Sequence, residues 1–238
     1  MPMSGASKRP KGSKRYPRRH RAGEITLLLN EVYASVQGEG PETGFPTVFV
    51  RLTGCNLRCS YCDGAHAFYE GSRIGLGALL QRISSYQISR VLITGGEPMA
   101  QTGTPALCRA LLRGRFKISI ETNGSYPLDT LPRRVVKVVD VKTPGSGAGD
   151  SFQVELLSSL TRKDALKFVV TGKSDYLWSR DFILNNGLQQ KRAPQLFISP
   201  AWGKVKPSDL AEWAVEDRLD ARVQVQLHKV LWGNRRGV

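Results

Sequence analysis

Three cysteines lie within eight positions in the segment GCNLRCSYCD, residues 54–63, and this concentration of thiols is the clearest chemical feature of the chain. They are Cys55, Cys59 and Cys62, and the chain has only one other cysteine, Cys108. One disulfide would leave the third thiol of the group unpaired. Three thiolates in a short loop can instead bind three irons of an iron–sulfur cluster or a single zinc ion. The spacing therefore predicts a metal centre.

Zinc is the alternative metal for this loop. His66 follows Cys62 by four residues and could complete a Cys3His tetrahedron. The segment continues as DGAHAF, however, without a second pair of ligands, so iron–sulfur is preferred. Cys108 lies in a helical pattern on the face expected to be buried, which favours a small core residue over a fourth ligand.

Beyond residue 24, short β-branched segments alternate with helical patterns, which is typical of parallel strands joined by crossover helices. Strands are expected over residues 47–52, 90–94, 117–121, 134–141, 166–170, 195–199 and 222–227. Helices are expected over residues 76–86, 105–114, 175–186 and 208–217, the last with Ser208 as its N-cap. The pattern predicts an α/β fold, a partial (incomplete) TIM-like barrel of about six βα units.

Polar and glycine-rich segments follow several of these strands. They are GGEP after residue 94, TNG after residue 121, KTPGSG after residue 141 and PAWG after residue 199. Ligands of such folds bind beyond the carboxyl ends of the strands. These segments are therefore the expected binding loops, although any one of them alone is also typical of an ordinary turn.

The composition is that of a globular protein, with 40% hydrophobic and 23% charged residues in 238. The first 23 residues carry eight Lys or Arg and no acid, which predicts a disordered basic tail (1–23) ahead of one domain (24–238). The chain has a formal net charge of +15, which favours anionic ligands. Without a secretory signal or a long apolar run, and with few cysteines, a cytoplasmic protein with no membrane role is expected.

The cysteine spacing, with Tyr61 before the last cysteine and Gly95-Gly96-Glu97-Pro98 one strand later, resembles the radical S-adenosylmethionine (SAM) superfamily. The resemblance implies that Cys55, Cys59 and Cys62 bind a [4Fe–4S] cluster whose fourth iron has no protein ligand. In that superfamily SAM binds the open iron, and reduction of the cluster releases a 5′-deoxyadenosyl radical.

A closer resemblance extends from Glu31 to Trp232. The segments EVYASVQGEG, FVRLTGCNLRCSYCD, TGGEP, ETNG, DVKTPGSG, KFVV, ISPAWG and VQLHKVLWG together resemble the 7-carboxy-7-deazaguanine synthase family of queuosine and deazapurine biosynthesis. The resemblance implies a lyase that converts 6-carboxy-5,6,7,8-tetrahydropterin into 7-carboxy-7-deazaguanine with loss of ammonia. It also implies a homodimer, Mg²⁺ and an electron donor such as flavodoxin, with no direct need for nucleic acid.

The same resemblance assigns binding residues, although no protein acid or base. SAM would be bound by Tyr61, Cys62, Asp63, Gly95, Gly96, Glu97, Thr122, Asn123, Lys142, Ser146, Ser199 and Pro200. The pterin would be bound by Val36, Gln37, Gly38, Glu39, Arg51, Thr94 and His228. For two of these residues a purely structural role stays open: Arg51 could pair with a structural carboxylate, and His228 could be a core histidine.

The chain departs from the family at two places. Gly64 stands where family members often have a Thr whose hydroxyl contributes to the magnesium site, so Asp63 is left as a possible Mg²⁺ ligand. The segment GNRRGV also continues beyond Trp232, where some relatives end near the substrate.

Two other functions compete. A glycyl-radical activating enzyme would share the cluster and GGEP but would not need the SVQGEG segment, and a Cys3His zinc protein binding nucleic acid would fit the basic charge.

Overall fold

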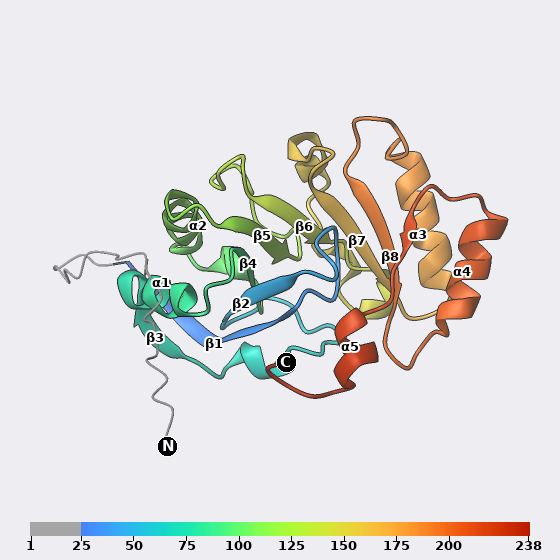
Figure 1. The fold of residues 1–238 in the computed structure, drawn as a ribbon. Coiled ribbons are helices and arrows are strands. Elements are labelled where there is room, and N and C mark those ends of the chain that lie inside the picture. Colours follow the sequence, from blue (N-terminus) through green and yellow to red (C-terminus); the bar gives the residue numbers. More distant parts are fainter. Residues whose placement is uncertain (1–24) are drawn as a thin grey trace, which may run out of the picture.

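The computed structural model describes residues 25–238. Within that range the strands form one nine-stranded sheet in the order β3-β1-β2-β4-β5-β6-β7-β8-β9. β1 (Thr26–Val36) pairs antiparallel with β2 (Pro46–Leu52) and with β3 (Ser72–Gly75), and every later pairing is parallel. Because the two ends of this order do not pair, the sheet curves without closing, as Figure 1 shows. The expected partial barrel is confirmed.

The parallel strands follow the β-branched segments of the sequence. They are β4 (Arg90–Gly95), β5 (Lys117–Thr122), β6 (Val136–Asp140), β7 (Ala165–Val170), β8 (Gln195–Pro200) and β9 (Arg222–Val223). All six residues of β7 are buried, as expected for a strand covered on both faces.

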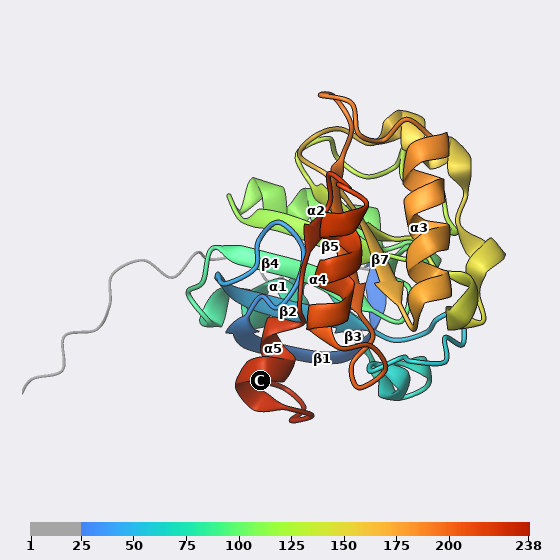
Figure 2. The same cartoon turned by 90° about the vertical axis from the view of Figure 1, so that its right-hand side faces the viewer.

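Four crossover helices cover the sheet. They are α1 (Leu76–Ser85), α2 (Thr104–Arg113), α3 (Lys173–Asn185) and α4 (Pro207–Glu216). α3 and α4 lie side by side (Figure 2), and the Tyr176 hydroxyl on α3 donates to the Trp213 carbonyl on α4 at 2.8 Å. α5 (Leu227–Trp232) lies apart from them, near the C-terminus in Figure 1. Short 3-10 turns, among them Pro144–Ser146, fill the connections after β6.

Strand alternation divides the core into two layers. In β7, Leu166, Phe168 and Val170 join the large core beneath the helices, whereas Ala165 packs with Val138 and Phe197 in a small cluster on the opposite face. That opposite face is the interior of the partial barrel. Because successive strand residues point to opposite faces, Lys167 must also point into the interior.

Two expectations about local structure were wrong, and two strands were missed. The strand expected over 222–227 ends at Val223, because the Gln224 side chain leaves the sheet to bind the backbone of Gly40, and Leu227 begins α5. Ser208 is not an N-cap: α4 begins at Pro207, whose fixed φ suits a first helical residue, and the Ser208 hydroxyl donates to Asp209. Strands β1 and β3 were not expected at all.

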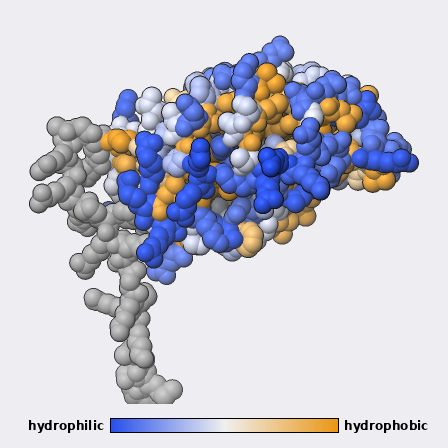
Figure 3. Space-filling model, turned by 90° about the horizontal axis from the view of Figure 1, so that it is seen from above, coloured by the Kyte–Doolittle hydropathy of each residue, from blue (hydrophilic) through white to orange (hydrophobic). Residues whose placement is uncertain are grey.

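The predicted basic tail, residues 1–23, lies outside the described residues, so it stays a prediction together with the domain boundary. Hydrophilic and hydrophobic side chains are interspersed on the face shown in Figure 3. Among residues 25–238, no helix has the length and apolar character needed to cross a bilayer.

Candidate functional site

A cavity of about 480 Å³ opens at the carboxyl ends of the parallel strands. Each central strand contributes one polar side chain that lines it: Arg51 from β2, Thr94 from β4, Glu121 from β5, Asp140 from β6 and Lys167 from β7. The parallel register aligns them, since Arg51 is paired with Thr94 and Asp140 with Lys167. Val138, Ala165 and Phe197 form an apolar cluster on the same interior face of the sheet.

A buried charge cluster forms one wall. The Lys167 ammonium lies 2.7 Å from Glu39 Oε2 and 3.4 Å from Asp140 Oδ2, and the Lys142 ammonium lies 2.9 Å from Asp140 Oδ2. Burial alone would raise the pKa of Asp140, but the two lysines outweigh it and hold that pKa below its usual value. Burial would likewise lower the pKa of Lys167, and the surrounding carboxylates instead raise it well above normal. Asp140 and Lys167 are therefore both ionised at neutral pH.

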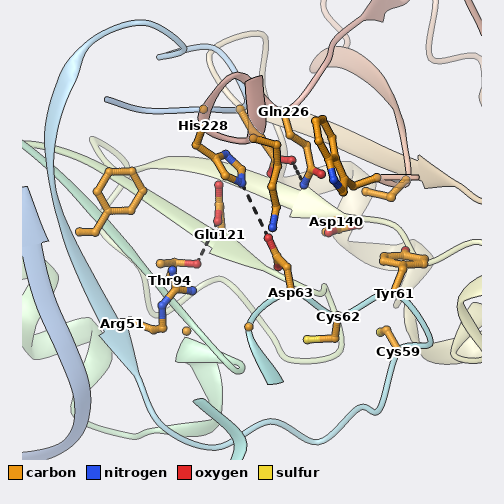
Figure 4. A pocket seen from close by; sticks show the side chains of 18 of the residues that line it. Arg51, Cys59, Tyr61, Cys62, Asp63, Thr94, Glu121, Asp140, Gln226 and His228 are labelled. Atoms are coloured by element: carbon orange, nitrogen blue, oxygen red, sulfur yellow. Dashed lines mark hydrogen bonds and ion pairs between the residues drawn. The ribbon is translucent and has the colours of Figure 1, made fainter. Parts of the chain in front are cut away.

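Glu121 lies next to this cluster. Its carboxylate accepts a hydrogen bond from the Thr94 hydroxyl at 2.9 Å, a contact drawn in Figure 4. Burial raises the pKa of Glu121 above its usual value, in spite of the opposing field of Lys167. A carboxyl group that protonates easily is thus placed between the ends of β4 and β5.

The loop after β1 is organised by the C-terminal helix. Glu39 Oε1 accepts from the Gln226 side chain at 2.7 Å, and the Gly38 carbonyl accepts from the Leu227 amide at 3.1 Å. A Cβ on Gly38 would lie 2.2 Å from Nδ1 of His228, so only glycine permits this approach. His228 Nε2 also lies 3.8 Å from Asp63 Oδ2, so α5 contacts the cysteine loop as well (Figure 4).

Arg51 has two protein partners. Its Nε donates to Glu31 at 2.8 Å and its Nη2 donates to the Tyr33 hydroxyl at 3.0 Å. The side chain is 18% exposed and lines the cavity. Arg51 therefore pairs with a protein carboxylate, as the alternative expected, and its side chain also lines the cavity.

The three cysteines of the loop line the same cavity. Burial raises the pKa of Cys59 and of Cys62, so bare thiolates are disfavoured there and a bound cation would be needed to stabilise them. The Leu57 amide points to Cys55 Sγ at 3.4 Å, the kind of N–H···S contact that suits a sulfur ligand. Cys108 is buried in α2 as expected, away from the group.

A single zinc ion fits this loop poorly. The His66 Nε2 atom lies 3.4 Å from Glu31 Oε1, where it faces an acid of β1. In the described part of the chain, no group of three or more His, Cys, Asp or Glu residues is placed to hold one metal ion. The three cysteines line an open cavity, which suits a cluster that keeps one iron without a protein ligand.

Two glycines bring the segment after β4 against the cysteine loop. A Cβ on Gly96 would lie 2.1 Å from the Gly54 carbonyl oxygen, and a Cβ on Gly95 would lie 2.0 Å from that of Leu52. The Gly96 amide donates to Leu52, and the Glu97 amide donates to Gly54 at 2.7 Å. The glycines therefore allow the two loops to share backbone hydrogen bonds at one side of the cavity.

Glu97 is fully buried beneath this junction. Its carboxylate accepts from the Met99 amide, the Thr122 hydroxyl and the Asn123 amide, at 2.7–2.8 Å. Burial raises its pKa, and these hydrogen bonds oppose the rise. Glu97 thus ties the GGEP segment to the end of β5, and its expected contact with a methionine ammonium stays a prediction.

Most of the expected site residues come together in this cavity. It is lined by Val36, Gln37, Gly38, Glu39, Arg51, Cys55, Cys59, Tyr61, Cys62, Asp63, Thr94, Gly95, Gly96, Thr122, Asn123, Lys142 and His228. The expected residues that do not line it are Glu97, Ser146, Ser199 and Pro200. These four are buried and do not line the cavity, so any contact that they make with a ligand would need local movement or would be indirect.

Sequence reasoning missed several residues of the cavity. Glu31 and Tyr33 lie on the unexpected strand β1, Gln226 precedes the unexpected helix α5, and Glu121, Asp140 and Lys167 stand within expected strands. A charged residue inside a β-branched strand was the available signal, because burial of such a residue needs a partner or a ligand.

Unpartnered polar atoms also mark the cavity as a binding site. The Tyr61 hydroxyl and Asp140 Oδ1 are both buried without a hydrogen-bond partner among the described residues. Tyr61 lies beside Lys142, whose ammonium is 5.6 Å from the ring centroid. A phenol and a carboxylate oxygen left free in this way can bind a ligand that both donates and accepts hydrogen bonds, such as a ribose.

The C-terminal residues 234–238 line the mouth of the cavity. Arg236 lies 2.9 Å from a carboxylate oxygen of Glu70 and 3.8 Å from one of Glu31. The segment beyond Trp232 therefore folds back over the site.

Comparisons with known proteins agree with this geometry. Residues 49–141 match the family model described as the Radical SAM superfamily. A 7-carboxy-7-deazaguanine synthase of Koribacter versatilis is 41% identical over 221 residues, covering 87% of this chain and 97% of that relative. One of Chlorobaculum tepidum is 35% identical, covering 90% of this chain and 99% of the relative. The crystal structure of QueE from Escherichia coli superposes with a TM-score of 0.71 at 22% identity, covering 85% of this chain and 95% of that one, which shows a shared fold.

Proposed function

Because the chain belongs to the 7-carboxy-7-deazaguanine synthase family of radical SAM lyases, we propose that it converts 6-carboxy-5,6,7,8-tetrahydropterin into 7-carboxy-7-deazaguanine with loss of ammonia. One observation carries the proposal beyond the family name. The Gln37–Glu39 loop and the three cysteines are separated in the sequence by strand β2, yet they line the same cavity. A cluster and a small heterocyclic substrate would therefore meet there.

The residues present fit a [4Fe–4S] cluster held by Cys55, Cys59 and Cys62. When bound, the cluster and SAM supply the radical that starts the reaction. The protein contributes three sulfur ligands, and the backbone junction at Gly54 and Gly96 holds the cysteine loop against the sheet. Cys108 is buried in α2 and does not line the cavity, so the protein would supply three thiolates and leave the fourth iron of the cluster without a protein ligand.

The ends of β5 and β6 fit SAM. Lys142 and Asp140 lie beside Tyr61, and the free Asp140 Oδ1 can accept from a ribose hydroxyl. Thr122 and Asn123 lie at the cavity wall, held by Glu97 through the bonds described above. These side chains would orient the cofactor and exclude water from it.

The opposite wall fits the pterin. Arg51 can donate two parallel hydrogen bonds to the substrate carboxylate from the edge that Glu31 and Tyr33 leave free. Glu39 and Gln37 can read the amino-pyrimidinone edge, because that edge presents donors and acceptors side by side. Glu121 can hold a proton between the two walls, since burial favours its neutral form.

We further propose that Mg²⁺ contributes less here than in family members that have a Thr at the position of Gly64. Gly64 has no side-chain oxygen to offer Mg²⁺. The neighbouring carboxylate, Asp63, faces His228. Mg²⁺ prefers several oxygen ligands, which the substrate and water would have to supply.

The remaining parts of the proposal follow the family resemblance. We propose a cytoplasmic homodimer that receives electrons from a donor such as flavodoxin and whose product enters queuosine or deazapurine biosynthesis. The basic surface of the body suits an acidic donor protein.

The decisive experiment is anaerobic turnover. Protein reconstituted with iron and sulfide is incubated with 6-carboxytetrahydropterin, SAM and dithionite, and the product is identified by mass spectrometry. Formation of 7-carboxy-7-deazaguanine and ammonia in equal amounts is expected. Reductive cleavage of SAM without any conversion of the pterin would refute the substrate assignment, and failure to bind iron and sulfide would refute the cluster.

A further inference from the structure

The loop after β6, residues 142–147, is held from below by the start of α3. Asp175 lies in the first turn of α3 and is only 2% exposed. Its Oδ1 accepts from the Gly145 amide at 2.8 Å, and its Oδ2 accepts from the Thr171 amide at 2.9 Å and from the Thr171 hydroxyl at 2.7 Å. These donors outweigh burial and lower the pKa of Asp175, so the carboxylate is charged and each bond is charge-assisted.

The same loop is held from above by the cysteine loop. Ser60 stands between Cys59 and Tyr61. Its hydroxyl donates to the Gly145 carbonyl at 2.9 Å, and its amide donates to the Ser146 carbonyl at 2.9 Å. One peptide segment thus joins a helix of the barrel wall to the loop that carries the cluster ligands.

The packing at Gly145 leaves no freedom for adjustment. A Cβ there would lie 2.2 Å from Thr171 Oγ1 and 2.4 Å from Asp175 Oδ2. The Asp175 carboxylate therefore touches the loop backbone itself, and moving this carboxylate would move the Gly145 and Ser146 carbonyls that Ser60 binds. The path from α3 to the cysteine loop consists of direct hydrogen bonds.

We infer that Asp175 and Ser60 are positioning residues of the SAM site: Asp175 fixes the 142–147 loop, and Ser60 sets that loop against the cysteine loop. Neither side chain lines the cavity. Their effect would act through Lys142 and Tyr61, which do line it and which lie at the two ends of this junction. The inference rests on the proposed function, because it assumes that SAM binds between these loops.

Two variants test the inference in the reconstituted full-length enzyme. Asp175→Asn keeps the shape of the side chain but removes the charge and places an amide nitrogen against N–H donors. Ser60→Ala removes one hydroxyl and leaves the amide bond to Ser146. Asp209→Asn, also in the first turn of its helix, and Ser85→Ala, whose exposed hydroxyl bonds only locally to Arg82, are matched controls. Ser60→Thr, which retains a hydroxyl, serves as the rescue variant.

The readouts are SAM affinity by anaerobic equilibrium dialysis, the SAM-dependent change in the electron paramagnetic resonance spectrum of the reduced cluster, and apoprotein unfolding temperature. Asp175→Asn should weaken SAM binding about tenfold and Ser60→Ala about threefold, the effect of losing a charged and a neutral hydrogen bond respectively. Iron content should match the wild type in both, Ser60→Thr should restore affinity, and neither control should change it.

Wild-type SAM affinity in both variants would overturn the inference. So would an Asp175→Asn variant that unfolds at lower temperature yet binds SAM normally, since that is the pattern of a purely structural residue. Should Asp175→Asn fail to fold, Ser60→Ala decides alone, because Ser60 is exposed and its loss leaves the core intact. A wild-type protein that binds no SAM would overturn the proposed function itself, which separates the two failures.

Discussion

Replacing Lys167 by Met should destabilise the protein more than any other single substitution of a cavity lysine. The Lys167 side chain is 7% exposed, and its ammonium lies 2.7 Å from Glu39 and 3.4 Å from Asp140. Its field also reaches Glu121. Met occupies a similar volume, so the packing survives, but the carboxyl groups of Glu39, Asp140 and Glu121, which are at least partly buried, lose their shared cation. Breaking a buried ion pair costs about 3–5 kcal/mol, and we expect a loss in unfolding free energy of this size at pH 7.

The loss should depend on pH. In the wild type, the folded pKa of Asp140 lies below its unfolded value, so its ionised form stabilises the fold above the unfolded pKa and this contribution disappears as the pH falls through the folded pKa. Without Lys167, Asp140 and Glu121 would both protonate at higher pH. The difference between wild type and variant should therefore be largest near neutrality and should shrink toward about pH 5, where the freed carboxyl groups become neutral.

Urea unfolding of the reduced apoprotein, followed by circular dichroism from about pH 5 to pH 8, measures both effects. Lys163→Met is the matched control, because Lys163 also pairs with an aspartate, Asp164, at 2.9 Å, but its side chain is 39% exposed. The control should lose less than about 1 kcal/mol at all pH values. Equal stability of Lys167→Met and the wild type at pH 7, or a difference that grows as the pH falls, would refute the electrostatic reasoning.

Three further predictions concern the cluster and the metal. Cys59→Ala should abolish product and lower the iron content of anaerobically reconstituted protein, whereas Cys108→Ala should retain its iron and lose only about 1 kcal/mol of unfolding free energy; equal iron content in the two variants would contradict the ligand assignment. Gly96→Ala places a Cβ 2.1 Å from the Gly54 carbonyl oxygen, so the cysteine loop must shift and iron incorporation should fall, and full incorporation measured by iron and sulfide analysis would count against this packing. In Gly64→Thr the new Cβ would lie 3.6 Å from its nearest neighbour, Arg51 Nη1, so this variant should fold normally. Mg²⁺ should stimulate the turnover of the variant several-fold more than that of the wild type. The wild type should keep most of its activity after treatment with a chelator. Equal stimulation of both proteins would show that the missing hydroxyl does not matter.

The sequence by itself determined the chemistry that is encoded locally. The three cysteines and the aromatic at Tyr61 are close along the chain, so their spacing already restricts which metal centre they can build. The alternation of β-branched and helical segments likewise predicted the parallel strands, because burial on both faces demands continuous apolar runs. Seventeen of the residues inferred from the family resemblance line one cavity. Those that follow parallel strands meet there because the carboxyl ends of such strands gather at one edge, whereas Val36 to Glu39 follow the antiparallel strand β1.

Only the tertiary structure decided how the charges are paired. Glu39 and Lys167 are separated by 128 positions in the chain, and Gln226 and Glu39 by 187, yet each pair is in contact at 2.7 Å. The β-branched strand around Lys167 indicates that its side chain is buried, but no local pattern identifies its partners, because the pKa and the partner of a charged side chain depend on what the fold brings next to it. The sequence also did not predict the antiparallel edge formed by β1 and β3, or the packing of α5 on the loop after β1. Both are stabilised by contacts between segments far apart in the chain, and these contacts form only once the sheet is in place.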